Sequence, residues 1–211
     1  MSGVASLGAE GFANAVGVSR ETMQRLEAYA ALLVAWSARI NLVGRATLGD
    51  LWRRHFLDSA QLQPLIPAGA RSLVDLGSGA GFPGLVLALL GVPGVELVEA
   101  DSRKAAFLRE AARITGAEAT VRGCRVEAVP AHAVDVVTAR GCAPLDRLLP
   151  LAERFIGQDT VCVFPKGARA EEELTAAGKA WTMTVSRHPS RADPGGSVLL
   201  LQQVVREPRR A

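Results

Sequence analysis

The chain has 211 residues and a net charge of +3. Its length predicts one domain with an extension, and 49% hydrophobic with 21% charged residues excludes a disordered chain. No apolar run reaches the roughly 20 residues that a membrane helix needs. The first 18 residues lack the basic start and the long apolar core of a secretory signal, so we expect a cytoplasmic protein without a membrane segment.

The basic residues are spread along the chain, and only three of the 24 are lysines. Arginine binds phosphate and guanine edges through two parallel hydrogen bonds, which is compatible with an RNA or DNA partner. Composition alone favours another explanation, a GC-rich coding sequence. Three widely spaced cysteines, Cys124, Cys142 and Cys162, fit neither a disulfide framework nor a zinc site. We expect each of them to be a small buried apolar residue.

The chain divides near residue 70. Residues 1–18 are rich in Gly, Ala and Ser and predict a flexible N-terminus. Residues 19–69 form a predicted helical extension, with Ser19 capping a helix over 20–38 whose apolar residues recur at the helical period. A second helix is predicted over 48–62, with Trp52, Phe56 and Leu57 facing inward.

Residues 70–211 alternate between strand and helix patterns, which predicts a parallel sheet with helices on both faces. The last two strands are separated by a turn-rich segment alone, so they pair antiparallel. This α/β pattern resembles the class I (Rossmann-like) methyltransferases, with a seven-stranded, mostly parallel sheet. The expected strands are 72–76, 95–99, 119–122, 134–138, 160–164, 181–187 and 197–205, and the expected helices are 82–90, 102–115, 145–155 and 170–177.

A glycine-rich loop joins the first strand to its helix. Residues 79–84 satisfy the GxGxxG pattern of dinucleotide sites. The series Asp75, Gly77, Gly79 and Gly81 instead fits S-adenosylmethionine (SAM), because a strand-end carboxylate helps to hold the ammonium group of that ligand. We favour SAM over a dinucleotide, with a purely structural turn as a further alternative.

Glu99 ends the second strand, where a carboxylate accepts hydrogen bonds from ribose hydroxyls. Both cofactors share this feature, so it does not discriminate between them; the alternative is a solvent-facing strand end. Asp101 or Ser102 is the predicted N-cap of the next helix, and we expect Asp101 to be a cap rather than a ligand.

Several further motifs occur in a fixed order, and together they carry a family resemblance. They are Asn41-Leu42, Arg54-His55-Phe56-Leu57-Asp58-Ser59, Asp75 to Gly84, Arg103-Lys104 with Phe107-Leu108, Arg125-Val126-Glu127, Asp135 to Arg140, and Lys166-Gly167. Over residues 20–205 the chain resembles the RsmG family of bacterial small-subunit rRNA guanine-N7 methyltransferases, also called glucose-inhibited division protein B. It departs from the family pattern at Val43, at Gly141-Cys142-Ala143 and at Pro165.

The resemblance implies an activity and a set of site residues. The family transfers methyl from SAM to N7 of guanine 527 in 16S rRNA, and its loss is linked to streptomycin resistance. The implied partner is 16S rRNA, the 30S subunit or its assembly intermediate, and we expect a monomer without a metal. The implied cofactor-binding residues are Asp75, Gly77, Ser78, Gly79, Gly81, Phe82, Glu99, Val126, Glu127 and Arg140; the implied RNA-binding residues are Asn41, Arg45, Arg54 and Lys166.

Guanine N7 carries a lone pair and no proton, so its methylation needs no general base. The site has to position two reactants and exclude water, and we assign Arg140 and Lys166 to substrate positioning. Arg140 either bonds the methionine carboxylate or donates to guanine O6, and Lys166 contacts rRNA phosphate or guanine; the alternative for each is a strand-end charge in solvent. For His55 and Asp58, which lie on one helix face, we favour a structural role, in which they bond each other and tie the extension to the sheet, over contact with RNA. The competing classes are a methyltransferase of a small molecule, a protein or another RNA, a nicotinamide-dependent oxidoreductase, and a non-enzymatic RNA-binding module.

Overall fold

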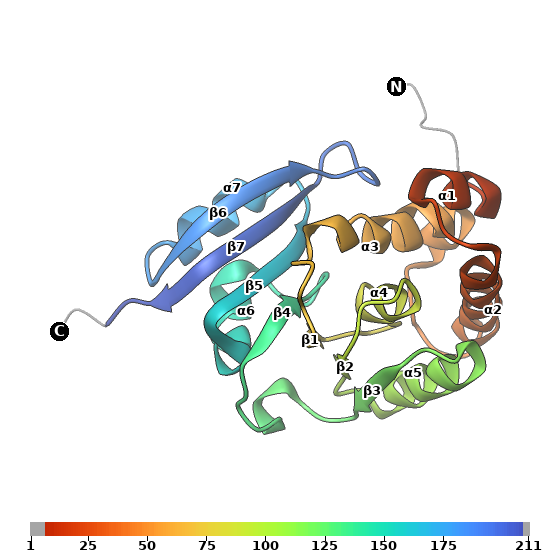
Figure 1. Cartoon of the computed structure of the whole chain (residues 1–211), viewed down its shortest axis with the longest axis horizontal. Coiled ribbons are helices and arrows are strands. Elements are labelled where there is room, and N and C mark those ends of the chain that lie inside the picture. Colours follow the sequence, from red (N-terminus) through yellow and green to blue (C-terminus); the bar gives the residue numbers. More distant parts are fainter. Residues whose placement is uncertain (1–6, 209–211) are drawn as a thin grey trace.

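The structure, a computed structural model, describes residues 7–208. Its centre is a seven-stranded sheet in the order β3-β2-β1-β4-β5-β7-β6 (Figure 1). The strands are β1 (Leu73–Leu76), β2 (Val95–Val98), β3 (Ala119–Arg122), β4 (Val134–Thr138), β5 (Ile156–Lys166), β6 (Trp181–Pro189) and β7 (Ser197–Arg206).

The first five strands are parallel, and β7 pairs antiparallel with both β5 and β6. The seven strands, the antiparallel ending and the mostly parallel sheet are therefore confirmed. Strand β5 is longer than expected because it begins at Ile156 rather than at Thr160.

Alternate residues along each strand face opposite sides of the sheet and build two cores. On one side Leu73 and Val136 pack with the extension and with α4 (Gly84–Leu89) and α5 (Ser102–Thr115). On the other side Val74 and Val137 pack with α6 (Leu145–Ala152) and α7 (Ala170–Ala177). Figure 1 shows α1 to α5 gathered at the β1–β3 half of the sheet.

The N-terminal region differs from the expected flexible segment. Residues Ala9–Val16 form helix α1, whose Phe12 is fully buried against Trp52 and Phe56. Gly- and Ala-rich composition predicted a frayed end, but one buried aromatic ring anchors this helix. The expectation is wrong for α1, and residues 1–6 lie outside the described part of the chain.

Helix α2 (Arg20–Ser37) matches its prediction, and the Ser19 side chain caps it by accepting a hydrogen bond from Thr22 N. The expected helix over 48–62 is present as a continuous helical segment over residues 51–60, but it is not a regular α-helix. A 3₁₀ turn (Arg45–Asp50) precedes it, a π-helical turn (Trp52–Leu57) leads into the short α3 (Asp58–Ala60), and a further 3₁₀ turn (Gln63–Leu65) follows. As expected, Phe56 and Leu57 are buried, whereas Trp52 is half-buried.

Candidate functional site

The glycine loop connects β1 to α4 at the carboxyl edge of the sheet. Gly79 has φ +58°, and a Cβ placed there would meet nothing nearer than Gly77 O at 3.8 Å. The space beside Gly79 is therefore open on the protein side. Its N–H donates to Glu99 Oε2 at 2.8 Å, which joins the loop to the end of β2.

At the other end of the loop, close packing explains why residue 81 is a glycine. A Cβ at Gly81 would lie 2.6 Å from the Tyr29 hydroxyl oxygen and 3.1 Å from Leu108. The fully buried Tyr29 on α2 donates its hydroxyl hydrogen to Ala80 O, and burial raises its pKa. The extension thus holds the loop in place. Tyr29 was not predicted as a site residue, although it is the chain's one tyrosine and lies on the predicted apolar helix face.

Asp75 is fully buried at the end of β1. Its carboxylate accepts hydrogen bonds from Thr138 Oγ1 at 2.9 Å and from Gly84 N at 3.3 Å, while Ser78 Oγ donates to its backbone carbonyl. Burial raises the pKa of Asp75 to about 6, against the lowering effect of these bonds. A carboxyl kept ionised in this position costs folding free energy.

Replacing Asp75 by asparagine is therefore expected to stabilise the fold near neutral pH. The folded state binds the Asp75 proton more tightly than the unfolded state, so wild-type stability falls as pH rises from about 4 to 6. The cost reaches at most about 3 kcal/mol at pH 7.5 and about half of that at pH 5. Urea unfolding of wild type and Asp75→Asn at both pH values measures the difference. A difference that does not change with pH contradicts the raised pKa.

Glu99 is buried and uses both carboxylate oxygens on backbone groups. Oε2 accepts from Gly79 N and Oε1 accepts from Asp101 N at 2.8 Å. An ionised carboxylate has about four acceptor positions, so each oxygen keeps one for a ligand hydroxyl.

Asp101 caps α5 as predicted by accepting from Arg103 N and Lys104 N. After β3, Val126 is buried and Glu127 is exposed on a 3₁₀ turn.

Arg140 follows β4 and is held by the extension. Its NH1 donates to Arg54 O at 3.0 Å and to Asp58 Oδ2 at 3.2 Å, and its NH2 donates to His55 Nδ1 at 2.8 Å. The guanidinium lies 5.0 Å from the centre of the Phe82 ring. Phe82 is buried and also stacks on His55 and Tyr29. Burial raises the pKa of Asp58, and the Arg140 charge opposes that rise.

The π-helical turn makes this arrangement possible. In an α-helix the Asp58 N–H would donate to Arg54 O. Here it donates to Arg53 O instead, and Arg54 O accepts from Arg140. Single π-turns occur frequently at functional sites.

His55 and Asp58 do tie the extension to the sheet, but through Arg140 rather than through each other. The Nδ1 atom of His55 accepts from Arg140, so Nε2 carries the hydrogen and donates to Thr47 Oγ1 at 2.8 Å, which in turn donates to Gly44 O. Both ring nitrogens are thereby occupied, and the expected bond to Asp58 is wrong. Burial and the Arg140 charge lower the pKa of His55 to about 3, so the ring is neutral.

A pocket of about 580 Å³ opens beside Arg140. Its walls come from the extension, the loop after β4, the end of β5 and the β6–β7 loop. Among the predicted site residues, it brings together Arg54, Arg140 and Lys166. Asn41 and Arg45 lie instead at a separate cavity of about 410 Å³.

The β6–β7 loop reaches the pocket because the extension binds it. Arg191 N donates to Gln61 Oε1 at 2.7 Å, and Arg53 NH1 donates to Ala192 O at 3.2 Å. An exposed ion pair joins Arg54 to Asp193 at 3.7 Å. The sequence predicted no role for this loop, since contacts over 129 or more residues leave no local signal.

Lys166 lies at the pocket but does not project into solvent. Its side chain is 9% exposed, and Nζ contacts Glu173 Oε2 at 2.8 Å and Ala143 O at 2.9 Å. The same Glu173 oxygen accepts from Leu145 N at 3.0 Å. The lysine is therefore already oriented by its neighbours.

The cysteines only partly match their expectation. Cys162 is buried, and burial raises its pKa to about 12. Cys124 is half-buried, and Cys142 is exposed at the pocket because the chain turns away from the core after β4. A Cβ at Gly77 would lie 2.8 Å from the Cys142 sulfur, so the pocket wall touches the glycine loop.

Neither a membrane helix nor a metal cluster is found in the described part of the chain. No helix within residues 7–208 has the length and apolar character to cross a membrane. Over the same residues, no group of three or more His, Cys, Asp and Glu side chains is arranged to hold a metal ion.

Known proteins match most of the chain. The family model for rRNA small subunit methyltransferase G matches residues 22–192. The ribosomal RNA small subunit methyltransferase G of Rhodospirillum centenum is 59% identical over 94% of this chain and 92% of its own length. The protein of the same name from Paramagnetospirillum magneticum is 60% identical over 95% and 98%.

The fold has more distant structural neighbours. A TehB-like SAM-dependent methyltransferase from Corynebacterium glutamicum superposes with a TM-score of 0.56 at 17% identity, covering 83% of this chain and 96% of the other. This similarity concerns the fold alone. The family model and the two relatives are much more similar to this chain, and they show that it belongs to the rRNA small subunit methyltransferase G family.

Proposed function

We propose that this protein transfers a methyl group from SAM to N7 of guanine 527 in 16S rRNA. It acts in the cytoplasm as a monomer on the 30S subunit or its assembly intermediate. The family membership supports the class of reaction, and the resemblance of the motifs supports the atom and the position.

One observation carries the proposal. The pocket and the glycine loop share a wall, because Cys142 lines the pocket and packs against Gly77. A base in the pocket and a cofactor on the loop are thereby neighbours. Placing two reactants side by side in a site shielded from water is the main requirement of an in-line methyl displacement.

The residues on the loop fit SAM. The open space beside Gly79 admits a ligand, and the free acceptor positions of Glu99 suit ribose hydroxyls. Asp75 is fully buried and bonded to Thr138 and Gly84, so it supplies negative charge beside the loop rather than a direct contact to the ammonium group. When bound, SAM supplies an electrophilic methyl group. The chain's own residues bind and orient the reactants.

The pocket also fits a reaction without a general base. His55 uses both ring nitrogens on Arg140 and Thr47, and Asp58 is paired with Arg140. Neither side chain is available to take a proton, and guanine N7 carries none.

Methyl transfer to undermethylated 30S subunits tests the proposal. Radiolabelled SAM reports the transfer, and borohydride–aniline cleavage of the rRNA locates a 7-methylguanine. Cleavage at guanine 527 is expected. Labelling at another nucleotide contradicts the proposed position, and no labelling despite SAM binding contradicts the proposed substrate.

Replacing Lys166 by alanine is expected to reduce methyl transfer about tenfold and to change SAM affinity less than about twofold, because Lys166 lies at the base pocket and not on the glycine loop. Calorimetry and steady-state kinetics on subunits measure the two effects. The exposed Lys179, which precedes β6, is the matched control. Equal losses of transfer and of SAM affinity contradict this division of roles.

A further inference from the structure

Arginines that are far apart in the sequence meet at one edge of the sheet. Arg103 follows β2, Arg125 follows β3, Arg147 follows β4 and Arg169 follows β5. These strands are parallel members of one sheet, so their carboxyl ends share an edge. We call these four residues the arginine edge.

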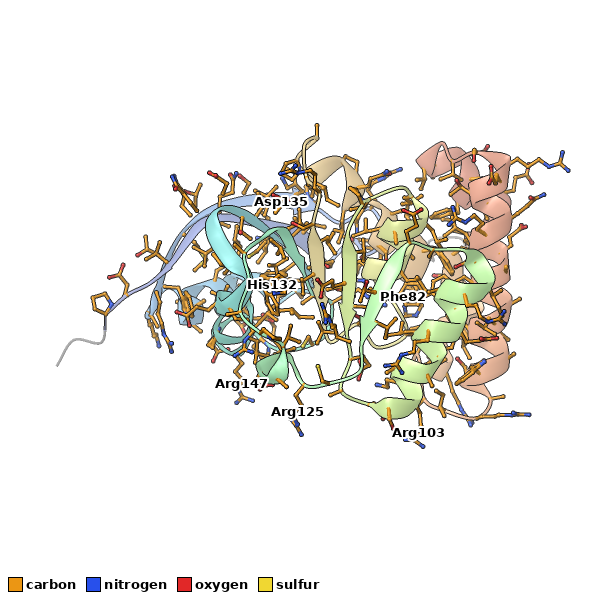
Figure 2. The ribbon with its side chains drawn as sticks, turned by 60° about the horizontal axis from the view of Figure 1, so that its bottom comes forward. Phe82, Arg103, Arg125, His132, Asp135 and Arg147 are labelled. Carbon is orange, nitrogen blue, oxygen red and sulfur yellow. The ribbon has the colours of Figure 1, made fainter. Side chains whose placement is uncertain are left out.

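The arginine edge faces solvent. All four residues are exposed. Figure 2 shows Arg103, Arg125 and Arg147 projecting from the side opposite Asp135, which lies near the beginning of β4. Arg169 lines the 580 Å³ pocket, so the arginine edge continues into that pocket. At about 4.8 Å per strand, the four steps from β3 to β5 span about 19 Å.

These side chains make few polar contacts in the described part of the chain. No hydrogen bond or ion pair within residues 7–208 involves the guanidinium of Arg125, Arg147 or Arg169. Arg103 lies 3.7 Å from Asp101 with 72% of its side chain exposed. By contrast, Arg25, Arg140 and Arg154 are fixed by backbone carbonyls.

Carboxylates also occur at this edge. Asp101 is committed to capping α5, Glu171 pairs with Arg187 and Glu173 pairs with Lys166. The remaining acids at this edge, Glu127, Asp146 and Glu172, are exposed. The exposed arginines exceed these exposed acids in number, and each presents a planar fork that matches a phosphate. A lysine or a carboxylate provides no such two-point contact.

We propose that the arginine edge binds the phosphate backbone of the rRNA strand that leads to the pocket. The inference rests on the proposed rRNA substrate and adds the surface that docks it. Phosphate contacts fix register and orientation without reading sequence. The pocket is then left to select the base.

Salt-dependent binding to undermethylated small subunits tests the proposal. Affinity is measured over about 50–200 mM salt for wild type, for Arg103→Gln, Arg125→Gln, Arg147→Gln and Arg169→Gln, and for paired variants. Each single variant is expected to bind several-fold more weakly and to lower the log–log salt slope by about 0.7–0.9, with unchanged SAM affinity. Arg71→Gln is the matched control, since Arg71 is exposed at the opposite edge of the sheet before β1.

The outcomes separate the alternatives. Wild-type slopes in the four variants overturn the proposal, as does an equal loss in Arg71→Gln. A loss of affinity with an unchanged slope also overturns it and indicates contact with a ribosomal protein. A wild-type enzyme that neither binds nor methylates the subunits contradicts the proposed function instead.

Discussion

The Gly79→Asp variant is expected to lose most of its affinity for the cofactor while the protein still folds. Gly79 has open space beside it, so the new side chain displaces no core atom. It occupies the place that we propose for SAM and adds a second carboxylate next to Glu99. We expect SAM affinity to fall by about 100-fold or more, which is about 2.7 kcal/mol. Calorimetric titration with SAM measures this loss.

Gly91→Asp is the control for backbone strain. Gly91 also has a positive φ, and a Cβ placed there would have no atom within 4 Å, but it lies in the turn after α4, away from the loop. Each variant is expected to lose about 1 kcal/mol of stability, because a non-glycine residue resists the left-handed conformation. That loss lowers the melting temperature by about 2–4 °C. Retained SAM binding in Gly79→Asp contradicts the assignment of the loop.

Replacing Arg140 by methionine is expected to damage both stability and catalysis. The change leaves the poorly exposed Asp58 carboxylate without its cation and leaves Arg54 O without a donor. Removing one member of a buried pair costs about 3–5 kcal/mol, which thermal unfolding detects as a fall of roughly 10 °C. Methyl transfer on 30S subunits is expected to fall about 100-fold, since a small misplacement of a reactant has that effect.

A double variant separates the two roles of Arg140. Asp58→Asn combined with Arg140→Met removes the unpaired charge, so most of the stability is expected to return. Methyl transfer is expected to remain low because no guanidinium lies over Phe82. Recovery of both stability and transfer would show that Arg140 acts only in the fold.

The sheet was predictable because its signals are local. The central strands β1, β2 and β4 and the buried part of β5 are short, mainly apolar runs, and the glycines after Leu76 mark the loop from the sequence alone. The positions of Asp75 and Glu99 at the ends of two parallel strands then predict that they lie close together, since the carboxyl ends of parallel strands meet at one edge of the sheet. The sequence also showed that the last two strands pair antiparallel, because the segment between them is too short for a crossover.

The partners of Arg140 were not predictable in this way. Arg54 and Asp58 lie 82 or more residues from Arg140, and their contact depends on a π-turn whose shifted hydrogen bond has no composition signal. Helix α1 was missed because one tertiary contact, the burial of Phe12, outweighs a weak local preference. Lys166 was recognised as a strand-end cation, but its pairing with Glu173 needed the fold.

The pocket walls come from distant parts of the sequence, which matters while the chain is being synthesised. The walls combine early residues such as Thr47 and His55 with Ser190 and Ser197 near the end of the chain. A ribosome makes the chain from the N-terminus, so the residues of the β6–β7 loop are added after those of the other walls. A chain synthesised only as far as β6 therefore has the glycine loop but lacks one wall of this pocket.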